Sequence, residues 1–154
     1  ADKMILLGDI LYHGPRNDLP KEYNPKKIIP LLNEIKNEVL CVRGNCEAEV
    51  DNMVLNFDCM ADYALLSFGK NTVFITHGHK YNTSAPPSLK DGDILIHGHT
   101  QIPACEDCGY YTYINPGSVS LPKEGNPKSY AIYDNGMVSI VDLDGNTLIC
   151  GSVM

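Results

Sequence analysis

Short apolar runs separated by turn residues recur along the whole chain and predict a protein rich in β-strands. The expected strands lie at 4–8, 39–43, 63–68, 72–77, 93–98, 110–115, 129–134, 137–143 and 147–152. The continuous apolar runs among them are typical of strands that are covered on both faces. The turn sequences "YDNG" (133–136) and "DLDGN" (142–146) predict hairpins between the last three strands.

Helical periodicity is confined to the first part of the chain. In "PKKIIPLLNEIKNE" (25–38) apolar residues recur at helical spacing, and because Pro30 interrupts the run we expect the helix to begin near Pro30. A short helix is expected within 46–56. Helices and strands early, followed by a meander, predict an α/β fold in which two sheets form a layered sandwich. The length of 154 residues predicts a single domain over 1–154.

Composition and charge narrow the class of protein. A hydrophobic fraction of 44% and a charged fraction of 20% are typical of soluble globular proteins, and no apolar run is long enough for a membrane span. The net charge of −7 argues against stable nucleic-acid binding. Scattered cysteines and the lack of a signal-peptide pattern favour the reduced cytoplasm. The "CEDC" of 105–108 has no second CxxC, so a hairpin is favoured there over a metal or redox motif.

Four apolar strands end in the same way, with a glycine beside a side chain that can bind a metal ion. These side chains are Asp9, Asn45, His77 and His99. Taken singly, each is more often a turn, cap or hydrogen-bonded residue than a ligand. Taken together they predict a shared metal site, because ligand sites lie at the carboxyl ends of strands in open α/β sheets. Two imidazoles, a carboxylate and an amide oxygen suit Mn, Fe, Ni or Zn.

The ordered motifs "GDILYHGPRN", "VRGNCE", "ITHGH", "HGHT" and "NPGSVSLPKEGNP" resemble those of the calcineurin-like metallophosphoesterases, specifically the small bacterial YfcE-type phosphodiesterases. The resemblance implies a four-layer αββα sandwich with a dinuclear metal site between the sheets. It also implies hydrolysis of small phosphodiesters through a metal-bound hydroxide, usually with manganese.

The resemblance assigns roles to the residues of these motifs. Asp9 would bridge both metals, and Asn45, His77 and His99 would complete the shell of the second. Cys46 stands where many other relatives have a histidine that assists at the leaving group or the phosphate.

Further roles concern the surroundings of the metals. His79 would orient a neighbour or touch substrate, whereas His97 is expected to be structural. Arg16 and Asn17 would lie at the rim, where Arg16 meets a phosphate oxygen or is simply a surface turn residue.

The chain departs from the family pattern in two places. Gln101 replaces a histidine that binds the first metal, and an amide oxygen is the weaker ligand. No D-x-H strand and helix precede Asp9. We therefore expect one bound metal rather than two, weak or absent hydrolysis, and an open apolar edge at 4–8 that favours a homo-oligomer. The alternatives are a non-catalytic binding scaffold, of the kind the family supplies to the retromer coat, and a mononuclear metal-binding protein.

Overall fold

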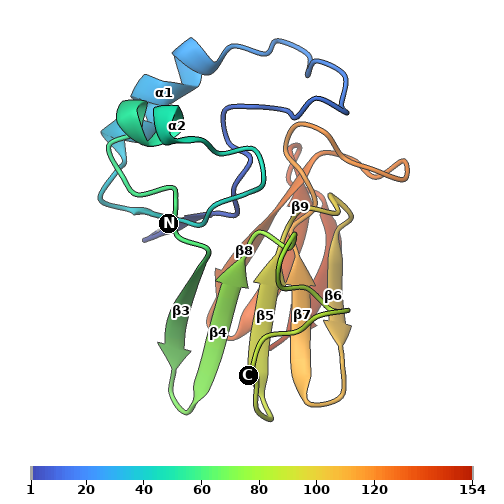
Figure 1. Ribbon diagram of the computed structural model, residues 1–154. Helices are drawn as coiled ribbons and strands as arrows, with labels where there is room; N and C mark the ends of the chain where they lie inside the picture. The colour runs from blue at the N-terminus through green and yellow to red at the C-terminus, as the bar shows by residue number, and fades with distance from the viewer. Residues whose placement is uncertain (1, 154) are drawn as a thin grey trace.

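The structure is a computed structural model that describes residues 2–153, in which two helices accompany ten strands arranged in three sheets (Figure 1). Along the chain the elements are β1 (Met4–Leu6), α1 (Pro25–Glu34), β2 (Val39–Cys41), α2 (Glu49–Val54), β3 (Tyr63–Phe68), β4 (Asn71–Thr76), β5 (Asp93–His97), β6 (Ala104–Asp107), β7 (Tyr111–Asn115), β8 (Ser129–Asp134), β9 (Met137–Asp142) and β10 (Thr147–Ser152). No described helix has the length and apolar character that crossing a membrane requires.

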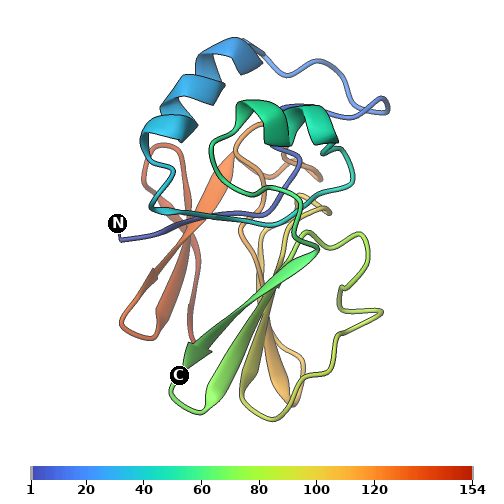
Figure 2. The same cartoon turned by 60° about the vertical axis from the view of Figure 1, so that its left-hand side comes forward.

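Two sheets pack face to face around the main core. The five-stranded sheet has the order β3-β4-β5-β7-β6, with β4, β5 and β7 parallel, and the antiparallel sheet has the order β10-β9-β8. Figure 1 shows the second sheet behind the first, and Figure 2 shows the two sheets beside each other. Fully buried Ile75 and Ile140 belong to the apolar cluster between them. The α/β sandwich predicted from the sequence is confirmed.

The hairpins expected from turn residues are confirmed as well. Strands β8 and β9 pair through the Asn135-Gly136 turn, and β9 pairs with β10 across 143–146. The "CEDC" segment lies in the antiparallel hairpin of β6 and β7, and the Gly109 turn that connects them has a positive φ of 94°. All six cysteines are free thiols.

Helix α1 begins five residues earlier than expected. Asn24 caps it by accepting a hydrogen bond from the backbone N–H of Lys27, and Pro25 takes the first helical position, where its missing N–H costs nothing. Pro30 lies inside the helix rather than at its start. The helix tolerates Pro30 because that position is exposed, so water can reach the carbonyl group that loses its partner.

The helices and the parallel pair β1-β2 enclose a smaller apolar cluster, which includes Leu11, Cys41, Leu55 and Cys59. Strand β1 itself is less covered than its continuous apolar sequence predicts. The exposed fractions of Met4 and Ile5 are 43% and 37%. The reason is that β1 pairs only with β2 within the described residues, so its other edge stays open.

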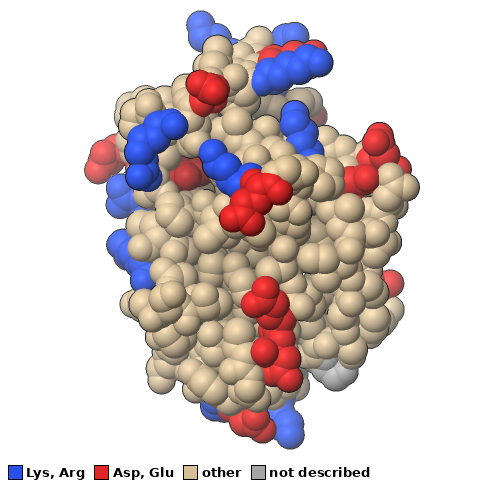
Figure 3. All heavy atoms as spheres, turned by 90° about the vertical axis from the view of Figure 1, so that its right-hand side faces the viewer, with Lys and Arg blue, Asp and Glu red and all other residues tan. Residues whose placement is uncertain are grey.

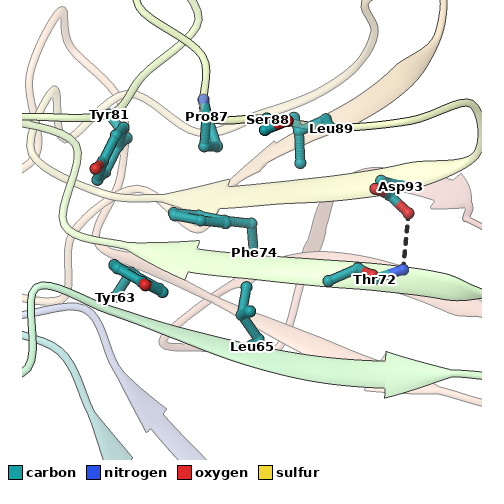
Figure 4. A pocket seen from close by; sticks show the side chains of 9 residues that line it. All are labelled: Tyr63, Leu65, Thr72, Phe74, Tyr81, Pro87, Ser88, Leu89 and Asp93. Carbon is teal, nitrogen blue, oxygen red and sulfur yellow. Dashed lines mark hydrogen bonds between the residues drawn. The ribbon is translucent and has the colours of Figure 1, made fainter.

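The outer face of the five-stranded sheet is covered by the irregular segment 77–92. Figure 4 shows Leu89 and Tyr81 of this segment lying over Phe74 of β4, and both pack on the cluster that contains Phe74. Within the described residues the helices therefore cover the β1-β2 side, and irregular chain covers the opposite side.

Candidate metal and active site

Four strand ends bring the predicted metal-type side chains to one end of the sandwich. Asp9 and Asn45 follow β1 and β2, while His77 and His99 follow β4 and β5. Strands β4 and β5 are parallel and run upward in Figure 1, so their carboxyl ends lie together at the upper edge of the five-stranded sheet. One candidate ligand atom each from Asp9, His77 and His99 lies within 4.8 Å of the other two.

The local backbone explains why glycines accompany these residues. A Cβ atom on Gly8 would collide with the backbone of Gly44, so only glycine lets the two strand ends approach this closely. Asp9 and His99 have positive φ angles of 56° and 57°, a left-handed conformation that is costly for residues with a side chain. Such strain persists only where surrounding contacts enforce it.

The ring of His77 connects the two parts of the fold. It is 2% exposed, and its Nδ1 lies 2.6 Å from the carbonyl oxygen of Leu7, just beyond β1. Its Nε2 lies 3.0 Å from Nδ1 of His99, 3.1 Å from Oδ1 of Asn45 and 3.3 Å from Oδ2 of Asp9.

This arrangement fits a cation. The carbonyl of Leu7 can only accept, so Nδ1 of His77 carries the proton and Nε2 of the neutral ring presents a lone pair. That lone pair faces the carboxylate of Asp9 and the amide oxygen of Asn45, which are also acceptors. Lone pairs converging on one point are satisfied together by a shared positive charge, which a divalent metal ion supplies.

The pKa shifts of the cluster agree with this account. Burial alone lowers the pKa of His77, but the hydrogen bond and negative charge of Asp9 outweigh it and raise the pKa above its usual value. Burial raises the pKa of Asp9, whereas the contact with His77 brings it below its usual value. Burial and the neighbouring His77 lower the pKa of His99. The metal-free cluster therefore favours a proton between Asp9 and His77, where a metal ion would compete with it.

A buried carboxylate fixes both loops beside the cluster. Glu47 is 5% exposed and accepts backbone hydrogen bonds from Asp9 (2.9 Å), Ile10 (2.7 Å) and Gly44 (2.5 Å). The Asp9 carboxylate in turn accepts the backbone N–H of Cys46 at 2.9 Å. These contacts hold Asp9 in its left-handed conformation and join the segment after β1 to the segment after β2.

A pocket of about 350 Å³ opens beside the cluster. Its lining includes Asp9, Asn45, Cys46, His99 and Gln101 from the strand ends. The remaining polar lining comes from the loop that follows Asp9 and from the chain between β7 and β8, and consists of Arg16, Asn17 and Lys123. The residues expected at the rim therefore do border the same space as the cluster.

Cys46 lies in this pocket as a protonated thiol. Burial, followed by the negative charge of Asp9, raises the pKa of Cys46 to about 11. The side-chain amide of Asn45 donates to its sulfur at 3.4 Å. A thiol in this state is a weak hydrogen-bond donor and a poor nucleophile at neutral pH.

Two further histidines, His79 and His97, lie near the cluster but outside it. The ring centroid of His79 is 5.3 Å from that of His77, and its buried Nδ1 has no hydrogen-bond partner among the described residues. His97 is buried, its ring lies 4.5 Å from that of Tyr113, and its Nδ1 contacts the carbonyl of Gly98. His97 thus packs behind the site.

Two residues of this site were missed by sequence reasoning. Glu47 follows Cys46 in "VRGNCE", and nothing in its sequence neighbourhood indicates that the carboxylate turns inward to bind three backbone amides. Lys123 lies in "SLPKEGNP", far along the chain, and only the folded chain brings it to the pocket. A second pocket, on the outer face in Figure 4, has Asp93 as its one charged lining residue, and that carboxylate already binds backbone amides of 72 and 90.

Comparison with known proteins agrees with the fold. Residues 1–136 match the model of the calcineurin-like phosphoesterase superfamily domain. The chain is 44% identical over 149 residues to phosphodiesterase YfcE of Escherichia coli strain K12, covering 97% of this chain and 81% of that protein. It is 30% identical over 118 residues to the probable metallophosphoesterase YsnB of Bacillus subtilis strain 168, covering 70% of this chain and 65% of that protein.

The structural comparison gives the same result. A solved structure of the phosphoesterase YfcE from E. coli superposes with a TM-score of 0.97 and 41% sequence identity, covering all of this chain and 85% of that one. The fold, the converging strand ends and these matches together establish that the chain belongs to the calcineurin-like phosphoesterase superfamily, a family of hydrolases.

Proposed function

We propose that this chain hydrolyses small phosphodiesters with divalent metal ions held by Asp9, Asn45, His77 and His99. The observation that supports this most strongly is the convergence of ligand atoms on Nε2 of His77. One atom each of Asn45, His99 and Asp9 lies within 3.3 Å of that nitrogen. Manganese is the proposed ion, since a site with mixed imidazole and oxygen ligands and no thiolate suits a borderline metal.

The remaining pocket residues have roles that follow from their chemistry. When bound, the metal would neutralise negative charge on the phosphate and lower the pKa of a coordinated water molecule. Arg16 would donate hydrogen bonds to phosphate oxygens, assisted by Asn17 and by the thiol of Cys46. His79 would present its neutral ring, since burial lowers its pKa, to the substrate or to a neighbouring ligand.

Hydrolysis of bis(p-nitrophenyl) phosphate with and without Mn²⁺ tests the proposal. We expect release of p-nitrophenol that chelation abolishes and Mn²⁺ restores. His99→Ala should reduce the rate by more than about 100-fold, since removal of residues that merely support metal ligands costs 10–100-fold. His13→Gln, which removes an imidazole outside the cluster, should change it by less than about twofold. Activity that is insensitive to chelation, or equal in both variants, would contradict the proposal.

The number of bound metal ions separates the dinuclear site from the alternatives. The family site would hold two ions, with Gln101 as a weak ligand of the first. The described residues form one such cluster, which favours one ion per chain. Elemental analysis after loading with Mn²⁺ distinguishes these cases, and a chain that binds none would favour the scaffold. The expectation of impaired hydrolysis finds no support in the described residues and stays a prediction.

A further inference from the structure

Two unpaired cations face the candidate active site. The pocket lining includes one acid, Asp9, and two basic residues, Arg16 and Lys123. Neither basic side chain forms a salt bridge within residues 2–153. In a chain with 19 acidic and 12 basic residues, two free cations on one pocket are an unusual concentration of positive charge. Most basic side chains visible in Figure 3 also lie in the upper half of the molecule, toward the end where β4 and β5 terminate.

The two cations come from different segments that line the pocket. Arg16 belongs to the loop that follows Asp9 and lines the pocket beside Asp9, Cys46 and His99. Among the described residues, Lys123 donates hydrogen bonds to Asn17 and Gln101 and forms none with the four proposed metal ligands. The pocket therefore has a cluster end, at the strand ends, and a second region around Lys123 and Asn17.

The ammonium group of Lys123 is held in place but not neutralised. It donates a hydrogen bond of 3.0 Å to Oδ1 of Asn17, and the Asn17 amide donates to the carbonyl of His13 at 2.7 Å. The backbone N–H of Lys123 also donates to the carbonyl of Gln101. Because an ammonium group has three donors and Asn17 takes one, two remain for an anion.

We propose that Lys123 determines specificity by binding a second negatively charged group of the substrate, on an ester arm beyond the phosphate. This rests on the proposed function, in which the phosphate itself lies at the cluster and Arg16. The substrate class is thus a phosphodiester that carries a further carboxylate or phosphate on one of its two alcohol groups. A diester with neutral arms would use only the cluster end.

A matched pair of esters tests this proposal. Phenyl p-nitrophenyl phosphate and its analogue with a carboxylate on the phenyl ring differ by one negative charge. Isothermal titration calorimetry on the chelator-treated chain gives the two dissociation constants without metal-dependent turnover. We expect the carboxylated ester to bind about fivefold more tightly, the effect of a strong but partly exposed ion pair. Release of p-nitrophenol with Mn²⁺ should give the same preference in KM, with kcat nearly unchanged.

Variants assign the preference to Lys123. Lys123→Met keeps the side-chain length and removes the charge, and it should abolish the preference, whereas Lys123→Arg should retain it. Lys128→Met, on the same segment but outside the pocket lining, should behave as the unmodified chain does. Because Lys123 is exposed, both of its variants should keep the melting temperature.

Equal affinities for the two esters, or a preference that survives in Lys123→Met, would overturn the role of Lys123. Absence of hydrolysis of either ester with Mn²⁺ would instead contradict the proposed function. The ratio of dissociation constants still decides the role of Lys123 in that case.

Discussion

At the scale of single residues, the candidate site depends on one buried carboxylate that contacts no ligand. Glu47 binds the backbone of Asp9, Ile10 and Gly44, and so holds two strand ends against each other. Its charge also contributes to raising the pKa of Cys59, after burial, to about 11. Glu47 thus fixes the backbone beside Asp9 and Asn45, and its negative charge also contributes to raising the pKa of His77 and of Cys46.

Glu47→Gln should destabilise the fold and weaken metal binding together. The amide has one acceptor oxygen instead of two and turns an N–H₂ group toward backbone donors. We expect a loss of about 2–4 kcal/mol in the free energy of unfolding, measured with urea. Calorimetric affinity for Mn²⁺ should also fall, by roughly 10-fold or more. Glu49→Gln on the exposed start of α2 is the control. An unchanged urea midpoint in Glu47→Gln would show that these hydrogen bonds contribute little.

At the scale of elements, local sequence decides most helix and hairpin boundaries, and the exceptions are informative. Helix α1 contains prolines at two positions with different consequences. Pro25 stands at the first helical position, where no intrahelical N–H bond is lost, and Pro30 stands in the interior, where one is. The stabilisation from the Asn24 cap and from Pro25 at the helix start exceeds the cost of the hydrogen bond that is lost at Pro30.

Pro30→Ala should therefore stabilise the protein. The change restores a helical hydrogen bond to the carbonyl of Lys26, and the more flexible unfolded chain offsets part of the gain. We expect a net increase of about 1–2 kcal/mol in the free energy of unfolding. Pro25→Ala should be neutral or destabilising, because Pro25 matches the first helical position. A loss of stability in Pro30→Ala measured by urea unfolding would mean that Pro30 makes a favourable contribution of its own.

The turn between β9 and β10 predicts a specific pH dependence. Asn146, which donates its side-chain and backbone N–H groups to the carboxylate at 2.8 Å, is the main cause of the lowered pKa of Asp142. A lowered folded pKa means that the charge stabilises the fold above the unfolded value of about 3.9 and stops doing so as pH falls through the folded pKa.

The difference in melting temperature between the unmodified chain and Asp142→Asn should thus be present at neutral pH and disappear in strong acid. Scanning calorimetry between about pH 7 and pH 2 checks this. If the difference in melting temperature is constant over that range, it results from packing or from hydrogen bonds of the introduced asparagine rather than from the charge of Asp142.

At the scale of the whole molecule, two open strand edges carry exposed apolar side chains. Met4 and Ile5 on β1 are exposed on a strand with one free edge, and so are Tyr63 and Leu65 on the edge strand β3. Open edges with apolar side chains favour pairing with another molecule.

We expect the chain to sediment as a dimer or larger assembly at micromolar concentration. Met4→Lys should shift it toward the monomer, because a charged side chain on the edge opposes strand pairing. Leu19→Lys, at an exposed position away from the strands, is the control. A clean monomer for the unmodified chain in sedimentation velocity would contradict this prediction.

The sequence by itself determined the features that depend on neighbours along the chain. Alternating and continuous apolar runs gave the strands, Asn-Gly and Asp-Gly turns gave the last hairpins, and the glycine-flanked strand ends indicated Asp9, Asn45, His77 and His99. Local chemistry suffices there, because turn conformation and strand burial are set within a few residues. The early start of α1 was not predicted from the sequence, because the Asn24 cap favours an earlier start than Pro30 suggests. The exposure of β1 was not predicted either, because burial depends on partners that are distant along the chain.

Only the tertiary structure decided how these side chains meet. The lone pairs around His77, the inward turn of Glu47 and the arrival of Lys123 beside Asn17 join residues between 22 and 106 positions apart. Packing of the two sheets and closure of the loops above them set those distances. The sequence therefore determines which side chains can act as ligands, whereas the folded backbone determines where each of them points.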